Sequence, residues 1–205
     1  MTQIKPISDE TLEVLKNIPT QTLIDGLWVK GWPSGYVEGA KPLQLGQSMA
    51  GRAVTLRFVP HRPDIAEDKP KKEKSAEYLA IELCGPGEVL VIDAMGWEYS
   101  SIGGDIKFMR LMQLQVGGLV TDGGVRDSVA LKEYGFPVYS ASTTAKQGPA
   151  DFWPWQVNDA IQCGRVLVRP GDAVVGDDDG VVVVPRSEVD EVIRIAHERE
   201  KVEEV

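Results

Sequence analysis

The apolar positions along this chain change repeatedly between helical and strand spacing. Spacings of three and four residues predict helices at residues 9–16, 20–28, 76–83, 106–115, 129–134 and from Ser187 onward. Alternation and short apolar runs predict strands at residues 51–59, 88–92, 117–121, 137–140, 165–168 and 180–184. Because helices and strands follow one another through the centre of the chain, the pattern indicates an α/β fold. Its sheet should be at least partly parallel and covered by helices.

Three of the predicted helices carry a more specific expectation about packing. The helix at residues 76–83 should bury one stripe, formed by Ala76, Leu79, Ala80 and Leu83. The helix at residues 106–115 is apolar nearly all round, at Ile106, Phe108, Met109, Leu111, Met112 and Leu114, so we expect it to be buried on several sides. The closing helix should use Ser187 as its N-cap and pack through Val189, Val192, Ile193 and Ala196.

Neither an internal repeat nor a domain boundary is visible, so residues 1–205 are predicted to form a single domain. Residues 60–75 are rich in proline and charge and predict a solvated loop; a lysine-rich docking patch is the alternative interpretation. The segment Asp177-Asp-Asp-Gly180 lies between apolar runs and predicts a hairpin turn. A calcium loop is disfavoured there, because the spaced ligand pattern is missing. Residues 152–155 (Phe-Trp-Pro-Trp) form an aromatic cluster that should pack at the core or at a subunit edge.

Composition narrows the class of protein further. The formal net charge of −9 disfavours nucleic-acid binding but would suit a basic protein partner. Cys84 and Cys163 are far apart and predict buried thiols in a reducing compartment. His61 and His197 are too separated to suggest a metal pair. No apolar stretch approaches the roughly 18 residues that span a bilayer, so we expect a cytoplasmic protein without a membrane partner.

The residues with the clearest chemistry are Gly103-Gly-Asp105 and Asp122-Gly-Gly-Val-Arg-Asp127. Arg126 and Asp127 follow a predicted strand, and ligands of α/β sheets bind beyond the carboxyl ends of strands. The glycines precede a predicted helix, whose first amides, near Ile106 and Lys107, could bind a carboxylate together with the Arg126 guanidinium. Asp127 offers a hard oxygen ligand for Mg²⁺ or Mn²⁺. The alternative is a tight turn in which Arg126 and Asp127 only pair with their neighbours.

Gly103-Gly-Asp105 followed by residues 117–127 (Gly-Gly-Leu-Val-Thr-Asp-Gly-Gly-Val-Arg-Asp) resembles the signature of the RraA-like family. That family includes the 4-hydroxy-4-methyl-2-oxoglutarate aldolases and the regulators of ribonuclease E activity. Further similar segments lie at residues 20–25, 51–54, 85–93, 168–172 and 176–185. The resemblance implies a swivelling-domain-like β/β/α core with a mixed sheet and packed helices. It also implies a homotrimer or a homohexamer with active sites between subunits.

The resemblance also implies roles for individual residues. In the aldolases, the residue matching Asp127 binds the divalent metal and the one matching Arg126 holds the substrate. The residue matching Asp105 lies beside the site and can reach water on the metal. From the glycine-started helix itself, we expect Gly104, Asp105, Ile106 and Lys107 to contribute to substrate binding. The regulators commonly lack the aspartate after the arginine, so Asp127 favours the enzyme. A carboxy-terminal glutamate of a neighbouring subunit also reaches the aldolase site, and Glu198, Glu200, Glu203 and Glu204 remain alternatives for it.

The chain departs from the aldolase pattern at Ala130, where an acidic residue is usual, and residues 60–75 resemble an insertion. The prediction is a metal-dependent (class II) aldolase, with Mg²⁺, Mn²⁺ or Co²⁺, that releases pyruvate from a 4-hydroxy-2-oxo acid. Oxaloacetate decarboxylation should accompany it, because both reactions form the pyruvate enolate. The chemistry requires no Schiff base, although Lys107 could contact the substrate. The alternative is a non-catalytic regulator that binds an RNA-processing ribonuclease.

Overall fold

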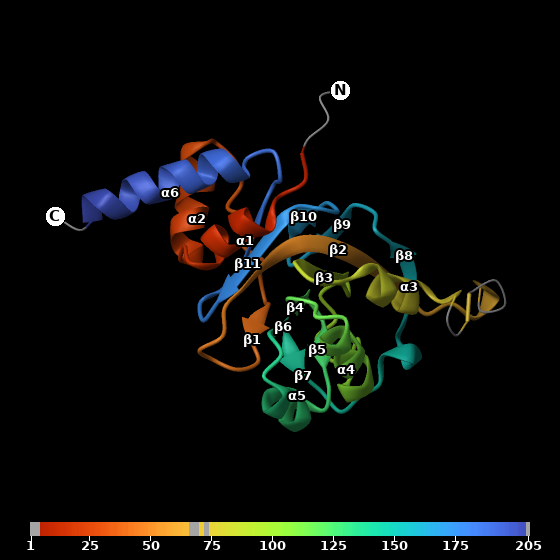
Figure 1. The fold of residues 1–205 in the computed structure, drawn as a ribbon. Helices are drawn as coiled ribbons and strands as arrows, with labels where there is room; N and C mark the ends of the chain where they lie inside the picture. Colours follow the sequence, from red (N-terminus) through yellow and green to blue (C-terminus); the bar gives the residue numbers. More distant parts are fainter. Residues whose placement is uncertain (1–4, 66–69, 72–73, 204–205) are drawn as a thin grey trace.

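The computed structural model describes residues 5–65, 70–71 and 74–203 (Figure 1). The α-helices are α1 (Asp9–Lys16), α2 (Thr20–Val29), α3 (Ala76–Leu83), α4 (Asp105–Gln113), α5 (Ser128–Tyr134) and α6 (Val189–Glu203). Short 3-10 turns are η1 (Pro63–Ile65) and η3 (Gly148–Ala150). The strands of the first half are β1 (Lys41–Pro42), β2 (Met49–Pro60), β3 (Glu88–Asp93), β4 (Gly118–Thr121) and β5 (Gly124–Val125). Those of the second half are β6 (Val138–Ser140), β7 (Ser142–Thr143), β8 (Phe152–Val157), β9 (Ile161–Cys163), β10 (Val166–Val168), β11 (Ala173–Asp177) and β12 (Gly180–Val184).

Strand β2 organises the main sheet, which has eight strands in the order β1-β6-β4-β3-β2-β11-β12, with β8 also paired to β2. Along one edge β2 pairs with β3 in parallel, and the parallel run continues through β4 to β6. Along its other edge β2 pairs antiparallel first with β11 and then with β8, and the register of the β8 pairing shifts between Arg57 and Phe58. Two small sheets, β9–β10 and β5–β7, complete the fold. The predicted α/β class with a mixed sheet is confirmed.

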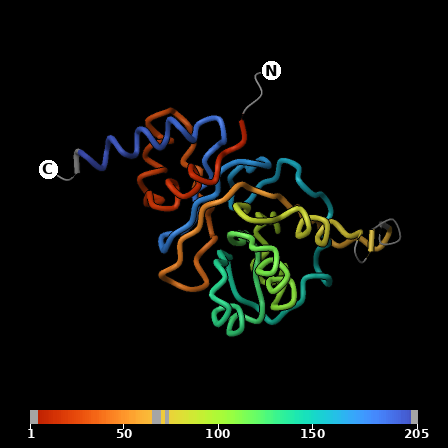
Figure 2. The backbone as a smooth tube through the Cα atoms, in the orientation of Figure 1, coloured from red at the N-terminus to blue at the C-terminus, as the bar shows by residue number. Residues whose placement is uncertain are grey.

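Helices cover the sheet in two separate groups (Figures 1 and 2). Helices α3, α4 and α5 pack on the parallel half, around a core that includes Leu56, Phe108 and Leu119. Helices α1, α2 and α6 pack on β11 and β12, around Leu23, Leu27 and Val182. Apolar area removed from water stabilises a fold by roughly 25 cal/mol per Å², so both cores contribute. The long strand β2 joins the two halves.

The predicted burial of α3 and α4 is wrong in part. In α3, Leu79 and Leu83 are about half exposed, and Ile81 is buried with Ala76 and Ala80 instead. In α4, only Phe108 and Leu111 are buried, while other apolar side chains face outward: Ile106, Met109 and Met112. Each helix lies on the sheet through one face only, and no described residue covers the outer face. An all-round apolar pattern therefore did not mean a buried helix in the single chain.

The start of α6 also differs from the expectation. The helix begins at Val189, because the chain first makes a turn at residues 186–188 and the Glu188 carbonyl accepts the Val192 amide at 2.8 Å. The Ser187 hydroxyl contacts the Glu188 carboxylate at 3.2 Å, so Ser187 is not the N-cap. The predicted apolar face is confirmed, since Val189, Val192 and Ala196 are buried in the core.

Both cysteines are buried and free, as predicted. Burial raises the pKa of the Cys84 thiol to about 12, so it stays protonated near neutral pH. No helix in the described part of the chain combines the length and the apolar character needed to cross a bilayer.

The turn at Asp177 is a hairpin, as predicted, and it has a second structural role. Strands β11 and β12 pair antiparallel up to Asp177 and Gly180. The Asp177 carboxylate accepts three hydrogen bonds: from the Asp179 amide within the turn, and from the amide and hydroxyl of Thr20, each at 2.9 Å. Thr20 is the first residue of α2, so the carboxylate also neutralises the positive end of that helix. The hairpin and α2 are thereby held together.

We predict that Asp177→Ala lowers the free energy of unfolding by about 2 kcal/mol, because it removes these three hydrogen bonds and leaves Thr20 unpaired. Urea denaturation followed by circular dichroism measures the change. Asp179→Ala is the matched control, since the exposed Asp179 side chain accepts no hydrogen bond among the described residues, and it should change stability by less than about 0.5 kcal/mol. Equal stability of the two variants would contradict the role of Asp177.

Candidate active site

The loops that follow the parallel strands meet at one edge of the sheet. Parallel pairing of β3, β4 and β6 places their carboxyl ends together. The loops after these strands are then joined by short backbone pairings: β5 with β7, and Ser101 with both Gly124 and Gln147. This backbone network brings Arg126 and Asp127 next to the start of α4.

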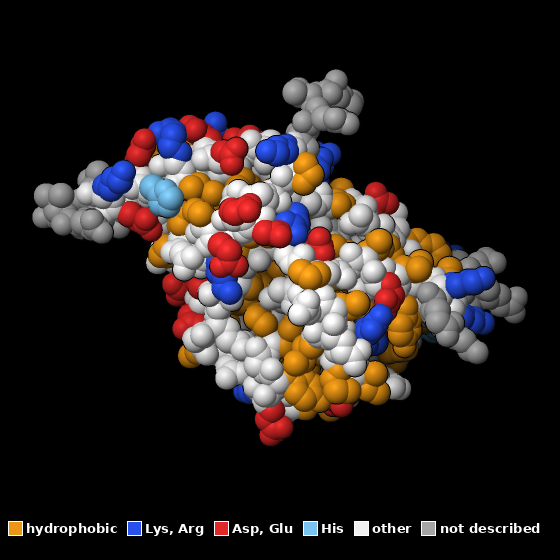
Figure 3. All heavy atoms as spheres, in the orientation of Figure 1, with side chains coloured by type: hydrophobic (Ala, Val, Ile, Leu, Met, Phe, Trp, Pro, Cys, Tyr) orange, Lys and Arg blue, Asp and Glu red, His pale blue; other side chains and the backbone are white. Residues whose placement is uncertain are grey.

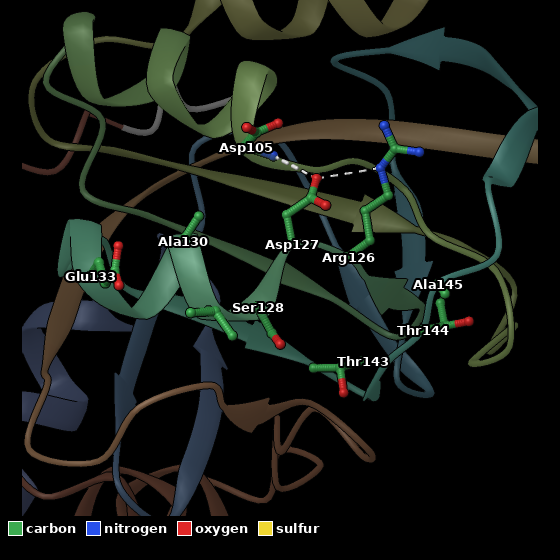
Figure 4. Close-up of a pocket in the computed structure, with 10 residues that line it drawn as sticks. Asp105, Arg126, Asp127, Ser128, Ala130, Glu133, Thr143, Thr144 and Ala145 are labelled. Carbon is green, nitrogen blue, oxygen red and sulfur yellow. Dashed lines mark hydrogen bonds and ion pairs between the residues drawn. The ribbon is translucent and has the colours of Figure 1, made fainter.

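The side chain of Asp127, at the start of α5, contacts the start of α4 (Figure 4). One carboxylate oxygen, Oδ2, accepts the backbone amide of Asp105 at 3.2 Å and lies 3.4 Å from Arg126 Nε. The Arg126 amide in turn donates to the Gly103 carbonyl at 3.1 Å. The structure thus brings together Asp105, Arg126 and Asp127, which the sequence singled out on two separate segments.

The backbone of Asp127 has an unusual conformation. Its φ of 59° and ψ of 34° lie in the left-handed region, which costs a non-glycine residue roughly 1–2 kcal/mol. Asp127 is the N-cap residue of α5, yet its side chain makes no capping hydrogen bond to that helix. The left-handed backbone instead turns the carboxylate toward Asp105 and α4.

Gly104 is required by how closely these side chains approach the chain. A Cβ built on Gly104 would lie 2.1 Å from Asp127 Oδ2 and 2.9 Å from Arg126 Cγ and Nε. Any side chain at position 104 would therefore displace both functional groups.

An open cavity of about 750 Å³ lies against Asp127. Its lining residues are Asp105, Arg126, Asp127, Ser128, Val129, Ala130, Glu133, Thr143, Thr144 and Ala145. A second cavity of about 210 Å³ lies on the other side of Arg126 and is lined by Gly103, Gly104, Ile106 and Lys107 among others. Arg126 and Asp105 border both cavities, so both side chains can reach a ligand in either one.

Several lining residues were not found from the sequence. Thr143 ends β7, and Thr144 and Ala145 follow it; the parallel pairing of β4 with β6 and of β5 with β7 places this segment at the site. Glu133 lies one helical turn beyond Ala130, on the same side of α5. Helical spacing from Ala130 was the signal that could have found it.

The amides at the start of α4 already have partners within the chain. The Ile106 amide donates to Asp105 Oδ1 at 2.8 Å, and the Lys107 amide donates to the Gly104 carbonyl at 3.1 Å. The Lys107 ammonium pairs with Glu77 and the Ile102 carbonyl, toward α3. Of the groups expected to bind a carboxylate, the Arg126 guanidinium is therefore the most available, and the substrate contacts of Ile106 and Lys107 remain predictions.

The groups at Asp127 fit a hydrated divalent cation. The Asp127 side chain is 39% exposed and offers oxygen atoms next to the larger cavity. Within the described residues, no group of three or more His, Cys, Asp or Glu side chains is arranged to hold a metal ion. A cation here would take one protein carboxylate and complete its shell with water and substrate oxygens, as Mg²⁺ commonly does.

Of the carboxy-terminal glutamates whose side chains the structure describes, Glu198 and Glu200, neither lines a cavity at Arg126. Glu198 pairs with Arg194 on α6, and α6 lies at the opposite end of the molecule from α4 and α5 (Figure 1). Glu200 and Glu203 belong to the same helix, and Glu204 lies outside the described residues.

Comparison with known proteins identifies relatives of two kinds. The family model described as RraA-like: Aldolase/RraA matches residues 20–183. A protein of Halalkalibacterium halodurans, whose name marks it as a candidate 4-hydroxy-4-methyl-2-oxoglutarate aldolase, is 32% identical over 90% of this chain and 81% of its own length. The crystal structure of Streptomyces coelicolor RraAS2, described as an unusual member of the RNase ES inhibitor RraA protein family, has a TM-score of 0.88. It is 32% identical and covers 98% of this chain and 97% of its own.

Proposed function

This chain belongs to the RraA-like family, and we propose that it is a divalent-metal-dependent aldolase that cleaves a 4-hydroxy-2-oxo acid, such as 4-hydroxy-4-methyl-2-oxoglutarate, to pyruvate. One observation supports this assignment above the others. The Asp127 carboxylate and the Arg126 guanidinium lie side by side between two cavities, at the end of α4 that carries Asp105. An anion-binding group and a hard cation ligand are both needed to hold a 2-oxo acid.

Arg126 binds the substrate carboxylate in this proposal. Its guanidinium donates in a planar fork that matches the two carboxylate oxygens. Because Arg126 borders both cavities, the reacting end of the substrate can lie beside Asp127 while the rest extends into the larger, open cavity. The pair of Arg126 with Asp127 would then loosen when substrate binds.

The reaction breaks the bond between C3 and C4 of the substrate. The 4-hydroxyl loses its proton and C4 becomes the carbonyl carbon of the second product. The electrons of the broken C3–C4 bond pass to the pyruvate enolate, and C3 is then protonated to give pyruvate. Asp127 would hold the divalent cation, which when bound would supply Lewis-acid stabilisation of the enolate charge. Asp105 accepts and returns the proton through water, since its carboxylate lies beside the site and borders both cavities. Loss of CO₂ from oxaloacetate forms the same enolate, so decarboxylation is an accompanying activity.

We predict that the protein releases pyruvate from 4-hydroxy-4-methyl-2-oxoglutarate and from oxaloacetate with Mg²⁺, Mn²⁺ or Co²⁺. EDTA should abolish the activity. Asp127→Ala should lower kcat/KM by about a hundredfold or more, because the carboxylate that we propose as the cation ligand is lost. A coupled lactate dehydrogenase assay measures pyruvate.

The control for this experiment is Asp179→Ala, which removes an exposed carboxylate that lines neither cavity at Arg126 and should retain wild-type activity. Absence of pyruvate from both substrates with all three metals would contradict the proposal. Equal activity of Asp127→Ala and wild type would contradict the role of Asp127.

We predict that Gly104→Ala lowers pyruvate release by about a hundredfold, because its Cβ displaces the Asp127 and Arg126 side chains from their positions. These half-exposed side chains can move aside, so the free energy of unfolding should change by less than about 1 kcal/mol. Gly85→Ala is the control, since a Cβ there approaches only the Glu88 carboxylate, at 3.3 Å. Full activity of Gly104→Ala would show that the close approach is not needed.

We propose that the chain assembles into a homotrimer or a pair of trimers through the outer faces of α3 and α4. These faces expose large apolar side chains, and Ile106 is 74% exposed. Figure 3 shows hydrophobic side chains gathered on this part of the surface. Apolar patches of this kind mark interfaces between proteins, and the patch adjoins the candidate site through α4.

Met109→Glu should therefore dissociate the oligomer, because a buried unpaired carboxylate would replace an apolar contact. Sedimentation velocity measures the assembly, with Leu45→Glu, at an exposed loop position, as the control that should remain assembled. A monomeric wild-type protein would contradict the assembly itself.

A second function remains a candidate because of the similarity to Streptomyces coelicolor RraAS2. In this alternative the acidic chain, with a net charge of −9, binds a basic segment of an RNA-processing ribonuclease. Stoichiometric capture of such a ribonuclease without metal-dependent pyruvate release would favour it over the aldolase.

A further inference from the structure

We propose that a third cavity, away from the candidate active site, binds a small organic anion with an apolar or aromatic body. The cavity has a volume of about 580 Å³ and is more enclosed than the cavity at Asp127. It lies between the loop after α2, strand β10 and the turn after β12. It shares no lining residue with either cavity at Arg126.

The walls of this cavity are largely apolar. Trp32 is 40% exposed and Leu167 is 67% exposed, while Val183 is buried behind them. Large apolar side chains that stay in contact with water inside an enclosed pocket are typical of ligand sites. The indole of Trp32 offers a flat face on which a ring could stack.

Two of the arginine side chains that line this cavity are available to bind an anion. Arg165 is paired with Glu38 at 3.2 Å. By contrast, the guanidinium groups of Arg169 and Arg186 have no hydrogen bond or ion pair with any residue in the described part of the chain, although Arg186 is partly buried. A partly buried guanidinium group without a hydrogen-bond partner loses part of its solvation, so an anion from outside would stabilise it.

The nearest carboxylate is already engaged by the backbone. Asp172 is buried and accepts the Arg169 amide at 2.9 Å and the Arg186 amide at 3.1 Å. Its charge acts on both guanidinium groups but forms no ion pair with either within 4 Å among the described residues. Asp172 therefore holds the two backbone segments in place and leaves both side chains free to bind a ligand.

The wall opposite the arginines is fixed before any ligand binds. The loop after α2 is attached to β12, because the Val183 amide donates to the Gly35 carbonyl at 2.8 Å and Tyr36 bridges to Val182. Gly35 has a φ of 67°, and a Cβ there would lie 2.4 Å from the Val183 carbonyl oxygen. A preformed wall lowers the entropic cost of binding. Shape, apolar lining and two free arginines together define the ligand as a small apolar acid.

The fluorescent probe 8-anilinonaphthalene-1-sulfonate, an aromatic anion, tests this site, with the neutral N-phenyl-1-naphthylamine as its uncharged counterpart. The double variant Arg169→Gln/Arg186→Gln should weaken binding of the sulfonate by about tenfold or more and leave binding of the neutral probe within about twofold. Trp32→Ala should weaken binding of both probes. Arg194→Gln, which removes an exposed arginine on α6 that does not line the cavity, should bind both probes like wild type.

Thermal unfolding of each variant by circular dichroism establishes that the fold is retained, and pyruvate release should be unchanged in the double variant. Sulfonate bound only at the exposed apolar faces of α3 and α4 would be insensitive to all these substitutions, and that result would overturn the proposal. The same holds if the double variant weakens both probes equally, because the arginines would then act on the shape of the cavity and not on the anion.

Discussion

The hydrogen bond from the Asp105 amide to the Asp127 carboxylate is the contact on which the rest of the candidate site depends. It joins the start of α4 to the start of α5 across the edge of the sheet. It requires a left-handed backbone at Asp127 and the absence of a side chain at Gly104, and it brings Arg126 between two cavities. Three local features that look unrelated in the sequence are therefore consequences of one close approach between two helix starts.

Much of the fold could be predicted from the period of the apolar positions, because that period reflects which face of each element meets the core. The observed limits of α1, α2 and α3 agree closely with the residue ranges that this period predicts. The period could not predict what lies against the outer face of α4, since core and subunit interface both select apolar residues. It also missed β8, where Trp153 and Pro154 lie in a strand that exists through pairing with β2.

The candidate site was predictable where its residues belong to a recognisable local motif, as Asp105, Arg126 and Asp127 do. Arg126 and Asp127 follow a strand, and their resemblance to a known family gave them roles. Thr143 and Glu133 were missed, because their positions depend on the register of parallel strands and on the placement of α5. The contact of Asp177 with Thr20 spans 157 positions and leaves no local trace. Such contacts arise when the two halves of the molecule pack, and a local pattern does not encode them.

The left-handed backbone at Asp127 also constrains how this protein can diverge over evolutionary time. Aspartate, asparagine and glycine tolerate that conformation better than other residues, and β-branched residues tolerate it worst. A lineage could therefore exchange Asp127 for asparagine or glycine, lose the negative charge, and keep the backbone that supports α5. The catalytic role that we propose for Asp127 and the fold are thus separable by a single codon change at this position, which would give a family with one architecture a route to members that bind without catalysing a reaction.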